Sequence, residues 1–266
     1  MTTSFYVISS TSEGGREAFS STSTTAGPWN SASQHGSPPS ALLGRAVERL
    51  PGADRLVGRL TVELLGPVPV GQLAVEAAVV RPGRRVELCG ATLYDVERAR
   101  PVARAHAWRF PDGVEGPRPE PSALLHGPGD GKEHPLPATW SPGYLQAVDW
   151  RWIEGGVGKP GPAVVWMRPR VALVEGEAAS PLQRLLACVD SASGVSSELD
   201  PAAWGFQNTE LTVHLLRRPV GEWFCLAAET TLGGGAVGVA TSSVYDEQGL
   251  VARTAQTLLV QPRQRG

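Results

Sequence analysis

The chain has 266 residues, 41% hydrophobic and 19% charged, which is enough to bury the core of one large domain or two ordinary ones. A formal net charge of -2 creates no general attraction for polyanions, so nucleic acid is not expected as a partner. Three widely spaced cysteines argue against a disulfide framework or a zinc site, and no apolar run approaches the roughly 20 residues of a membrane span. We expect a cytoplasmic protein without a bound metal or cofactor.

The first unit begins with a strand-rich opening and continues into an apolar segment after Ser37-Pro38. Proline is tolerated in a first helical turn, where its missing N–H would have no partner, so we predict a helix over 38–50. Alternation of apolar and polar residues over 59–64 indicates a strand with one buried face. The predicted strands of this unit are 56–66, 72–81, 84–95 and 101–110.

Residues 113–144 are rich in proline and glycine and show little periodicity, which is typical of a linker. We therefore predict an N-terminal domain over 1–112 and a C-terminal domain over 145–266.

The second unit has the same order of elements, with a predicted helix over 181–191. Its predicted strands lie near 208–217, 221–231, 236–245 and 250–261. Residues 233–238 match the pattern GxGxxG, but they lie between two predicted strands and do not open a helix. A hairpin turn is therefore expected there, and a dinucleotide site is not.

The two units repeat each other in sequence as well as in element order. The segment LTVELL at 60–65 returns as LTVHLL at 211–216, and Pro-Val-Gly at 69–71 returns at 219–221. Such ordered matches indicate a duplicated domain. One helix followed by an antiparallel meander must place its apolar face on the sheet. We therefore predict an α+β chain of two tandem hotdog domains, each with a long helix packed on a curved antiparallel sheet.

The two copies differ where polar side chains occur in one copy only. Asp190 aligns with apolar Val47, Asn208-Thr209 with Val57-Gly58, and Gln256 with Ala107. A carboxylate at the end of an apolar helix is costly to bury unless it has partners, and hydroxyl and amide side chains are suitable partners.

Through these residues the sequence is similar to a known family, and the similarity extends over nearly the whole chain. The chain resembles the acyl-CoA thioesterase II family of double-hotdog hydrolases. The resemblance implies an active site made of Asp190 in Ala-Cys-Val-Asp, Thr209 ten residues before Pro219, and Gln256 in Arg-Thr-Ala-Gln. The segment around His35 and Gly36 resembles the glycine-rich start of the family's first helix. It departs from that pattern at Ser37 and at the pair of prolines that follows.

The resemblance implies hydrolysis of an acyl-CoA, with Asp190 accepting a proton from water that Thr209 and Gln256 orient. His35, Gly36 and Asn208 are expected to bind the substrate. Backbone N–H groups at a helix start are expected to meet the developing oxyanion. Two arginines near the C-terminus, Arg253 and Arg263, are candidates for contact with CoA phosphates. The resemblance leaves open self-association into a homo-oligomer.

Two other functions stay open at this point. A hotdog hydratase acting on enoyl-CoA would need an Asp and a His five residues apart on a hydratase segment, and the sequence shows no such pair. A binding protein for acyl-CoA or lipid would keep the fold and lose the chemistry, as the missing polar residues of the first copy illustrate.

Overall fold

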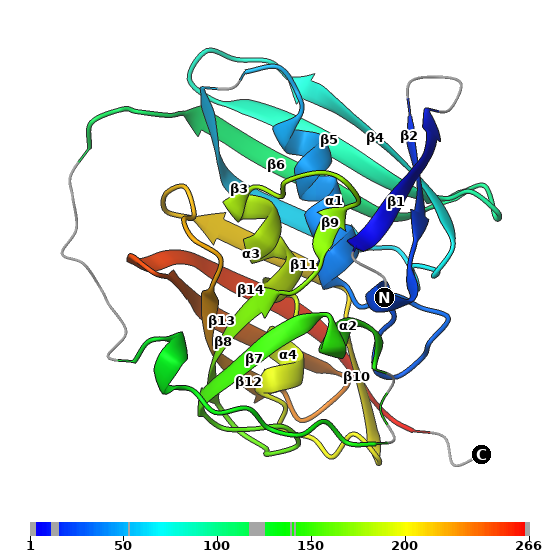
Figure 1. Ribbon diagram of the computed structural model, residues 1–266, viewed down its shortest axis with the longest axis vertical. Coiled ribbons are helices and arrows are strands. Elements are labelled where there is room, and N and C mark those ends of the chain that lie inside the picture. The colour runs from blue at the N-terminus through cyan, green and yellow to red at the C-terminus, as the bar shows by residue number, and fades with distance from the viewer. Residues whose placement is uncertain are drawn as a thin grey trace.

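Both halves of the chain contribute to one sheet, against which two helices pack side by side (Figure 1). The computed structural model describes residues 4–11, 16–52, 54–116, 126–138, 140 and 142–263. No helix in these ranges combines the length and apolarity that crossing a bilayer requires.

The first half supplies six strands and the helix α1. Its elements are β1 (Ser4–Thr11), β2 (Glu17–Ser21), the short 3-10 helix η1 (Ser23–Thr25), α1 (Ser37–Glu48), β3 (Arg55–Leu64), β4 (Gln72–Arg81), β5 (Glu87–Asp95) and β6 (Arg100–Pro111). The helix and the four strands predicted for this half are confirmed to within a few residues.

The second half follows a stretch that contains η2 (Pro128–Asp130) and α2 (Gly143–Gln146). Its remaining elements are β7 (Val148–Glu154), β8 (Ala163–Pro169), β9 (Ala172–Val174), α3 (Pro181–Val189), α4 (Ala192–Val195), β10 (Trp204–Asn208), β11 (Glu210–Leu215), β12 (Phe224–Leu232), β13 (Val237–Asp246) and β14 (Gly249–Pro262). The residues of the GxGxxG pattern link β12 to β13, as predicted.

Two details differ from the prediction. The helices are shorter than expected, with 12 residues in α1 and nine in α3. The second helix is short because it stops at Val189, and the separate helix α4 begins at Ala192. The strand predicted over 208–217 is interrupted at Thr209, which separates β10 from β11.

The sheet repeats the duplication of the sequence. Its order is β7-β8-β12-β13-β14-β11-β3-β6-β5-β4-β2-β1-β9, so corresponding strands lie at equal distances from the β11–β3 junction. The repeated Leu-Thr-Val segments pair with each other at this junction, where the equivalent residues Thr61 and Thr212 share a hydrogen bond of 3.1 Å. This pair therefore lies at the point about which the two copies are related.

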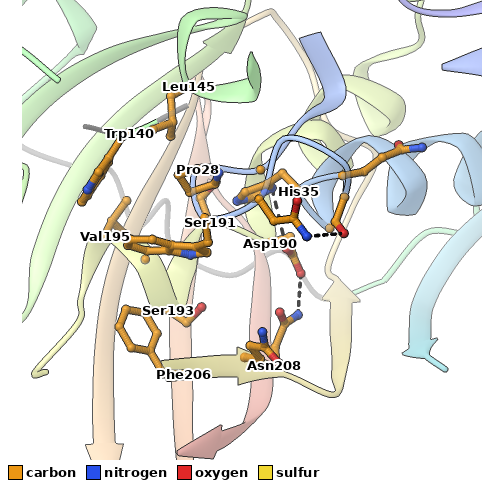
Figure 2. A pocket seen from close by; sticks show the side chains of 18 of the residues that line it. Pro28, His35, Trp140, Leu145, Asp190, Ser191, Ser193, Val195, Phe206 and Asn208 are labelled. Carbon is orange, nitrogen blue, oxygen red and sulfur yellow. Dashed lines mark hydrogen bonds and ion pairs between the residues drawn. The ribbon is translucent and has the colours of Figure 1, made fainter. Parts of the chain in front are cut away.

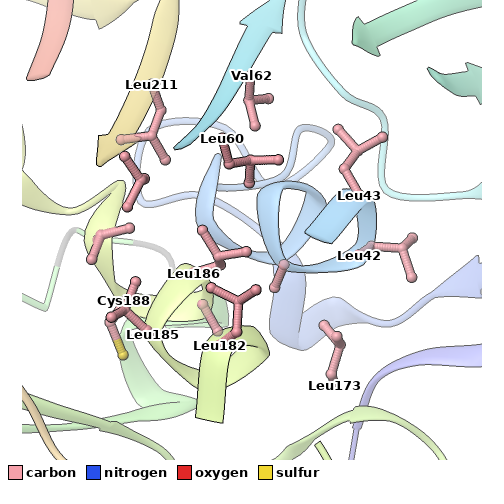
Figure 3. Packing of buried hydrophobic residues seen from close by; sticks show 14 of the residues in the cluster. Leu42, Leu43, Leu60, Val62, Leu173, Leu182, Leu185, Leu186, Cys188 and Leu211 are labelled. Carbon is pink, nitrogen blue, oxygen red and sulfur yellow. The ribbon is translucent and has the colours of Figure 1, made fainter. Parts of the chain in front are cut away.

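The helices α1 and α3 contact each other in the centre of the molecule (Figure 3). Leu42 and Leu43 of α1 and Leu185 and Leu186 of α3 have no exposed surface. Burying a leucine side chain contributes about 1.5–3 kcal/mol, so this contact is a main source of stability. One hydrophobic cluster includes both helices and strands from both halves.

Candidate active site

A cavity of about 420 Å³ opens where the two halves meet, next to the start of α1 and the end of α3. The first half contributes the loop before α1, and the second half contributes the break between α3 and α4 together with β10. All six predicted site residues except Gln256 line this cavity: His35, Gly36, Asp190, Asn208 and Thr209.

Asp190 lies at the carboxyl end of α3, where the helix stops. The helix begins with Ser180, whose hydroxyl accepts a hydrogen bond from the Gln183 backbone N–H, and with Pro181 in its first turn. Its buried face anchors it against α1 and the sheet, so the residue after Val189 has a fixed position. Asp190 is only 5% exposed, which makes it a carboxyl group in an apolar interior.

Two side-chain amides donate hydrogen bonds to Oδ1 of Asp190. Nδ2 of Asn208 lies 2.7 Å from this oxygen and Nε2 of Gln256 lies 2.9 Å from it (Figure 2 shows the Asn208 contact). The backbone N–H of Gly36 also bonds to the carboxyl group. The structure thus brings Asp190 and Gln256 together, and it adds Asn208 as a direct partner of the carboxylate.

Burial raises the pKa of Asp190 to about 7, because a charge is poorly solvated in this interior. The hydrogen bonds from Asn208 and Gln256 and the bond from Gly36 act in the opposite direction, while the nearby Glu210 carboxylate adds to the rise. Removal from water is the largest of these effects, so the group titrates near neutral pH.

Gln256 has no exposed surface and does not line the cavity. Its Nε2 donates to both Oδ1 and the backbone carbonyl of Asp190, and its Oε1 accepts from the backbone N–H of Ser193 at 3.1 Å. The amide therefore joins the end of α3 to the start of α4 and holds the carboxylate in place.

Gly36 touches the carboxylate from the other side. A Cβ atom at this position would lie 2.3 Å from Oδ2 of Asp190, closer than nonbonded atoms can approach. The residue has ordinary helical dihedral angles, so the requirement for glycine comes from this contact and not from the backbone conformation.

His35 lies in the cavity wall with its Nδ1 3.8 Å from Oδ2 of Asp190 (Figure 2). This distance is too long for a hydrogen bond, and Nδ1 already accepts one from the backbone N–H of Ser37 at 3.1 Å. Burial lowers the pKa of His35 to about 3, so the imidazole is neutral and carries its proton on Nε2.

Tyr144 fixes the His35 ring, and sequence reasoning missed it. The two rings stack with centroids 3.9 Å apart and an angle of 9° between their planes. The Tyr144 hydroxyl lies 2.8 Å from the carbonyl oxygen of Ala187 and also contacts the hydroxyls of Ser37 and Ser191. Tyr144 falls at the end of the predicted linker, where no periodic pattern marked it.

Thr209 lies at the rim of the cavity and has an exposed side chain. Its hydroxyl is 3.3 Å from the carbonyl oxygen of Thr257, and no hydrogen bond joins it to Asp190 in the described part of the chain. Neighbouring residues of an extended segment point in opposite directions, so only one of Asn208 and Thr209 can face the carboxylate. In this structure it is Asn208.

Aromatic side chains form much of the remaining wall. They are Trp29, Trp140, Trp150, Trp152 and Phe206. Trp166 does not line the cavity; its indole N–H donates to the carbonyl oxygen of His126.

The two candidate arginines lie in different places. Arg263 stacks over Trp29 at 5.4 Å, beside a second cavity of about 450 Å³ that shares Trp29 and Phe206 with the first. Arg253 is exposed on β14, donates to the hydroxyl of Ser243, and lines neither cavity.

Comparisons with known proteins agree with the repeat. The family model of the acyl-CoA thioesterase N-terminal domain matches residues 25–110, and that of the C-terminal domain matches residues 128–260. No curated protein matches the sequence.

Several solved structures share the fold over nearly the whole chain. A hotdog-fold protein of unknown function from Alicyclobacillus acidocaldarius has a TM-score of 0.75 at 18% identity and covers 95% of this chain and 96% of its own. A protein assigned as a thioesterase II from Thermobifida fusca also has a TM-score of 0.75, at 17% identity, with 98% of each chain covered. The acyl-CoA thioesterase II TesB2 from Mycobacterium marinum has a TM-score of 0.64 at 14% identity, covering 86% of this chain and 91% of its own. These likenesses support the double-hotdog fold.

Proposed function

Because the chain belongs to the acyl-CoA thioesterase family, we propose that it hydrolyses acyl-CoA thioesters with a water molecule activated by Asp190. The observation that supports this assignment is a buried carboxylate in the wall of a cavity, held by two amide side chains and one backbone N–H. A general base works best when its pKa lies near the working pH, and burial brings the pKa of Asp190 to about 7.

The reaction needs one proton acceptor that later returns the proton. Asp190 accepts a proton from water while the water oxygen bonds to the thioester carbon and the carbonyl oxygen becomes negative. The tetrahedral intermediate then collapses, the C–S bond breaks, and the proton on Asp190 passes to the departing sulfur. The products are the free acid and the CoA thiol, and the carboxylate is restored. General base catalysis of this kind contributes about 10²–10⁴-fold.

The residues around Asp190 have separate roles in this proposal. Asn208 and Gln256 both donate to Oδ1, so they orient the carboxylate, and neither of them occupies Oδ2. Since Gln256 does not reach the cavity, we assign it a positioning role. Thr209 lines the cavity beside Asn208 and has free lone pairs with which to hold the attacking water or the substrate.

The acyl group would occupy the aromatic part of the cavity. Its walls include Trp150 and Trp152, whose parallel rings lie 6.4 Å apart, and the edge-on pair Trp29 and Trp140. Burial of an apolar acyl group here contributes roughly 25 cal/mol per Å² removed from water. The CoA moiety would leave through the rim near Trp29, where Arg263 is the candidate contact for a phosphate.

Release of free thiol from acyl-CoA, measured with a thiol-reactive dye across acyl chain lengths, tests the proposal. Asp190→Asn should reduce kcat by at least about 100-fold, because it removes the base while keeping the size of the side chain and one oxygen that can accept from Asn208 and Gln256. Asp54→Asn, which changes an exposed aspartate, should behave like the wild type. Tight binding of acyl-CoA without thiol release by the wild-type protein would instead establish a binding protein.

A further inference from the structure

The backbone donors at the start of α1 are engaged within the protein, which leaves the proposed reaction without them. The Gly36 N–H bonds to Asp190, the Ser37 N–H bonds to Nδ1 of His35, and residues 38 and 39 are prolines without an N–H. The Ser40 N–H bonds to the carbonyl oxygen of Gly36 within the helix. The sequence expectation that these N–H groups meet the oxyanion is therefore not supported by their hydrogen bonding.

The break between α3 and α4 offers no better backbone donors. The Ser193 N–H bonds to Oε1 of Gln256, and the Gly194 and Val195 N–H groups bond to the carbonyl oxygen of Ser191. The side-chain amide of Asn208 is also engaged, because its Nδ2 contacts Asp190 and, at 3.3 Å, the carbonyl oxygen of Glu210.

We propose that the Nε2–H of His35 is the hydrogen-bond donor that polarises the thioester carbonyl and stabilises the oxyanion. This assignment rests on the proposed thioesterase function. Nε2 has no hydrogen-bond partner in the described part of the chain, and it is not enclosed by other atoms. His35 lines the same cavity as Asp190, so the donor is available to a substrate bound there.

The hydrogen bonds of His35 determine which nitrogen carries the proton. Because the Ser37 N–H donates to Nδ1, that nitrogen has no proton and Nε2 has one. The ring is held by its stack on Tyr144, whose hydroxyl is itself held by three contacts. A donor fixed in this way needs no reorganisation during the reaction, which is the main requirement for stabilising a developing charge.

The relative placement of the two groups suits the reaction. Nδ1 of the ring lies 3.8 Å from Oδ2 of Asp190, and only one ring carbon separates Nδ1 from Nε2. A thioester whose carbonyl oxygen accepts from Nε2–H is therefore bound in the same part of the cavity as the carboxylate that activates the water. A neutral imidazole is also a suitable donor, since it polarises a carbonyl without transferring its proton.

The matched variants are His35→Phe and His35→Gln. Phenylalanine retains a ring that can stack on Tyr144 but has no N–H, so kcat should fall about 10²–10³-fold, as when one oxyanion donor is removed. Glutamine provides an amide N–H, so the kcat of His35→Gln should be at least about tenfold higher than that of His35→Phe. His106→Phe is the control, because this histidine is exposed on β6 and lines neither cavity, and its kcat should stay within about threefold of the wild type.

A second measurement reports on the donor directly and does not depend on turnover. The infrared carbonyl band of a 13C-labelled acyl-CoA is recorded bound to the Asp190→Asn variant, which is expected to hold substrate without cleaving it. His35 should shift this band to lower frequency, and the shift should be lost when His35→Phe is added. Circular dichroism establishes that each variant is folded.

The outcomes separate this inference from the proposed function. The role of His35 would be overturned if Asp190→Asn is inactive but the kcat of His35→Phe stays within about threefold of the wild type. Asp190 would then still be the base. An unchanged carbonyl band would also overturn the role of His35. If His35→Phe instead abolished the titration near pH 7, the histidine would be the titrating group, and the donor role would be wrong.

Discussion

At the scale of single residues, the candidate site depends on one polar residue at a position that is apolar in the other copy of the repeat. Val47 of the first copy has no exposed surface, and its counterpart Asp190 occupies the same kind of interior with a carboxyl group. Burial therefore raises the pKa of Asp190, and the three donors around it offset only part of that rise. A structural position that disfavours charge thus holds the group that we propose as a base near neutral pH.

The pH dependence of kcat/KM follows from this environment. Activity should rise with pH through about 7, as Asp190 loses its proton, and then level off. Because the Glu210 carboxylate raises the pKa of Asp190, Glu210→Gln should move the midpoint of the rise to lower pH. Glu63→Gln, an exposed residue opposite Glu210 on β3, is the control. A midpoint that stays in place or moves upward in Glu210→Gln contradicts this account.

The same pKa has a consequence for stability. Asp190 titrates near 3.8 when unfolded and near 7 when folded, so the unfolded chain loses its proton first. The stability contributed by this group is therefore greatest below about pH 4 and is lost as pH rises to about 7.

Asp190→Asn removes this titration. At about 1.4 kcal/mol per pKa unit, the variant should gain up to roughly 4 kcal/mol over the wild type at pH 8, and less at pH 5. Urea unfolding at the two pH values measures the difference. An equal gain at both would show that the carboxyl group is not destabilised by burial.

At the scale of elements, the contact between α1 and α3 positions the site. Gly44 of α1 faces Leu186 of α3, and a Cβ at Gly44 would lie 2.3 Å from Cδ1 of that leucine. The glycine thus allows the helices to approach closely. That approach brings the start of α1, with His35 and Gly36 before it, to the end of α3, where Asp190 lies.

Gly44→Ala tests this packing. Alanine is the better helix former by about 1 kcal/mol, but overpacking a core costs about 1–3 kcal/mol, so we expect net destabilisation. In a Leu186→Ala background the clash is absent, and Gly44→Ala should then stabilise by up to about 1 kcal/mol. The four proteins of this double-mutant cycle are compared by urea unfolding. Equal effects in both backgrounds would mean that the two residues do not interact.

At the scale of the whole molecule, neither half by itself contains the complete candidate site. His35 and Gly36 come from the first half, whereas Asp190, Asn208 and Gln256 come from the second. The halves share a sheet across β3 and β11 and a single main hydrophobic cluster. Arg45 of α1, only 1% exposed, also forms ion pairs with Glu17 of its own half and Glu177 of the other.

This continuity predicts cooperative unfolding. Leu73 lies in the first half and Leu226 in the second, and both are fully buried in the shared cluster. Changing either to alanine should cost about 2–5 kcal/mol and lower the midpoint of one common transition. Circular dichroism and loss of enzymatic activity should follow the same urea curve. Two separate transitions, each sensitive to only one of the substitutions, would show that the halves unfold independently.

The sequence by itself determined the duplication, the α+β class and the order of elements, because hydrophobic periodicity and turn residues act locally. It also marked Asp190 and Gln256 as candidates, since a polar residue that replaces an apolar one in a repeat is visible without coordinates, and the structure places the two side chains in contact. The alignment of Asn208-Thr209 with Val57-Gly58 marked the segment at the end of β10 that supplies a hydrogen-bond partner of Asp190.

Only the tertiary structure decided how these residues are used. Asn208 rather than Thr209 bonds to Asp190, because strand direction at the break after β10 determines which side chain faces inward. The proton of His35 is assigned to Nε2 by a backbone hydrogen bond, and its ring is held by Tyr144, which is more than 100 residues away in sequence. Hydrogen-bond partners and ring contacts of this kind depend on how distant segments pack, and no local pattern encodes them.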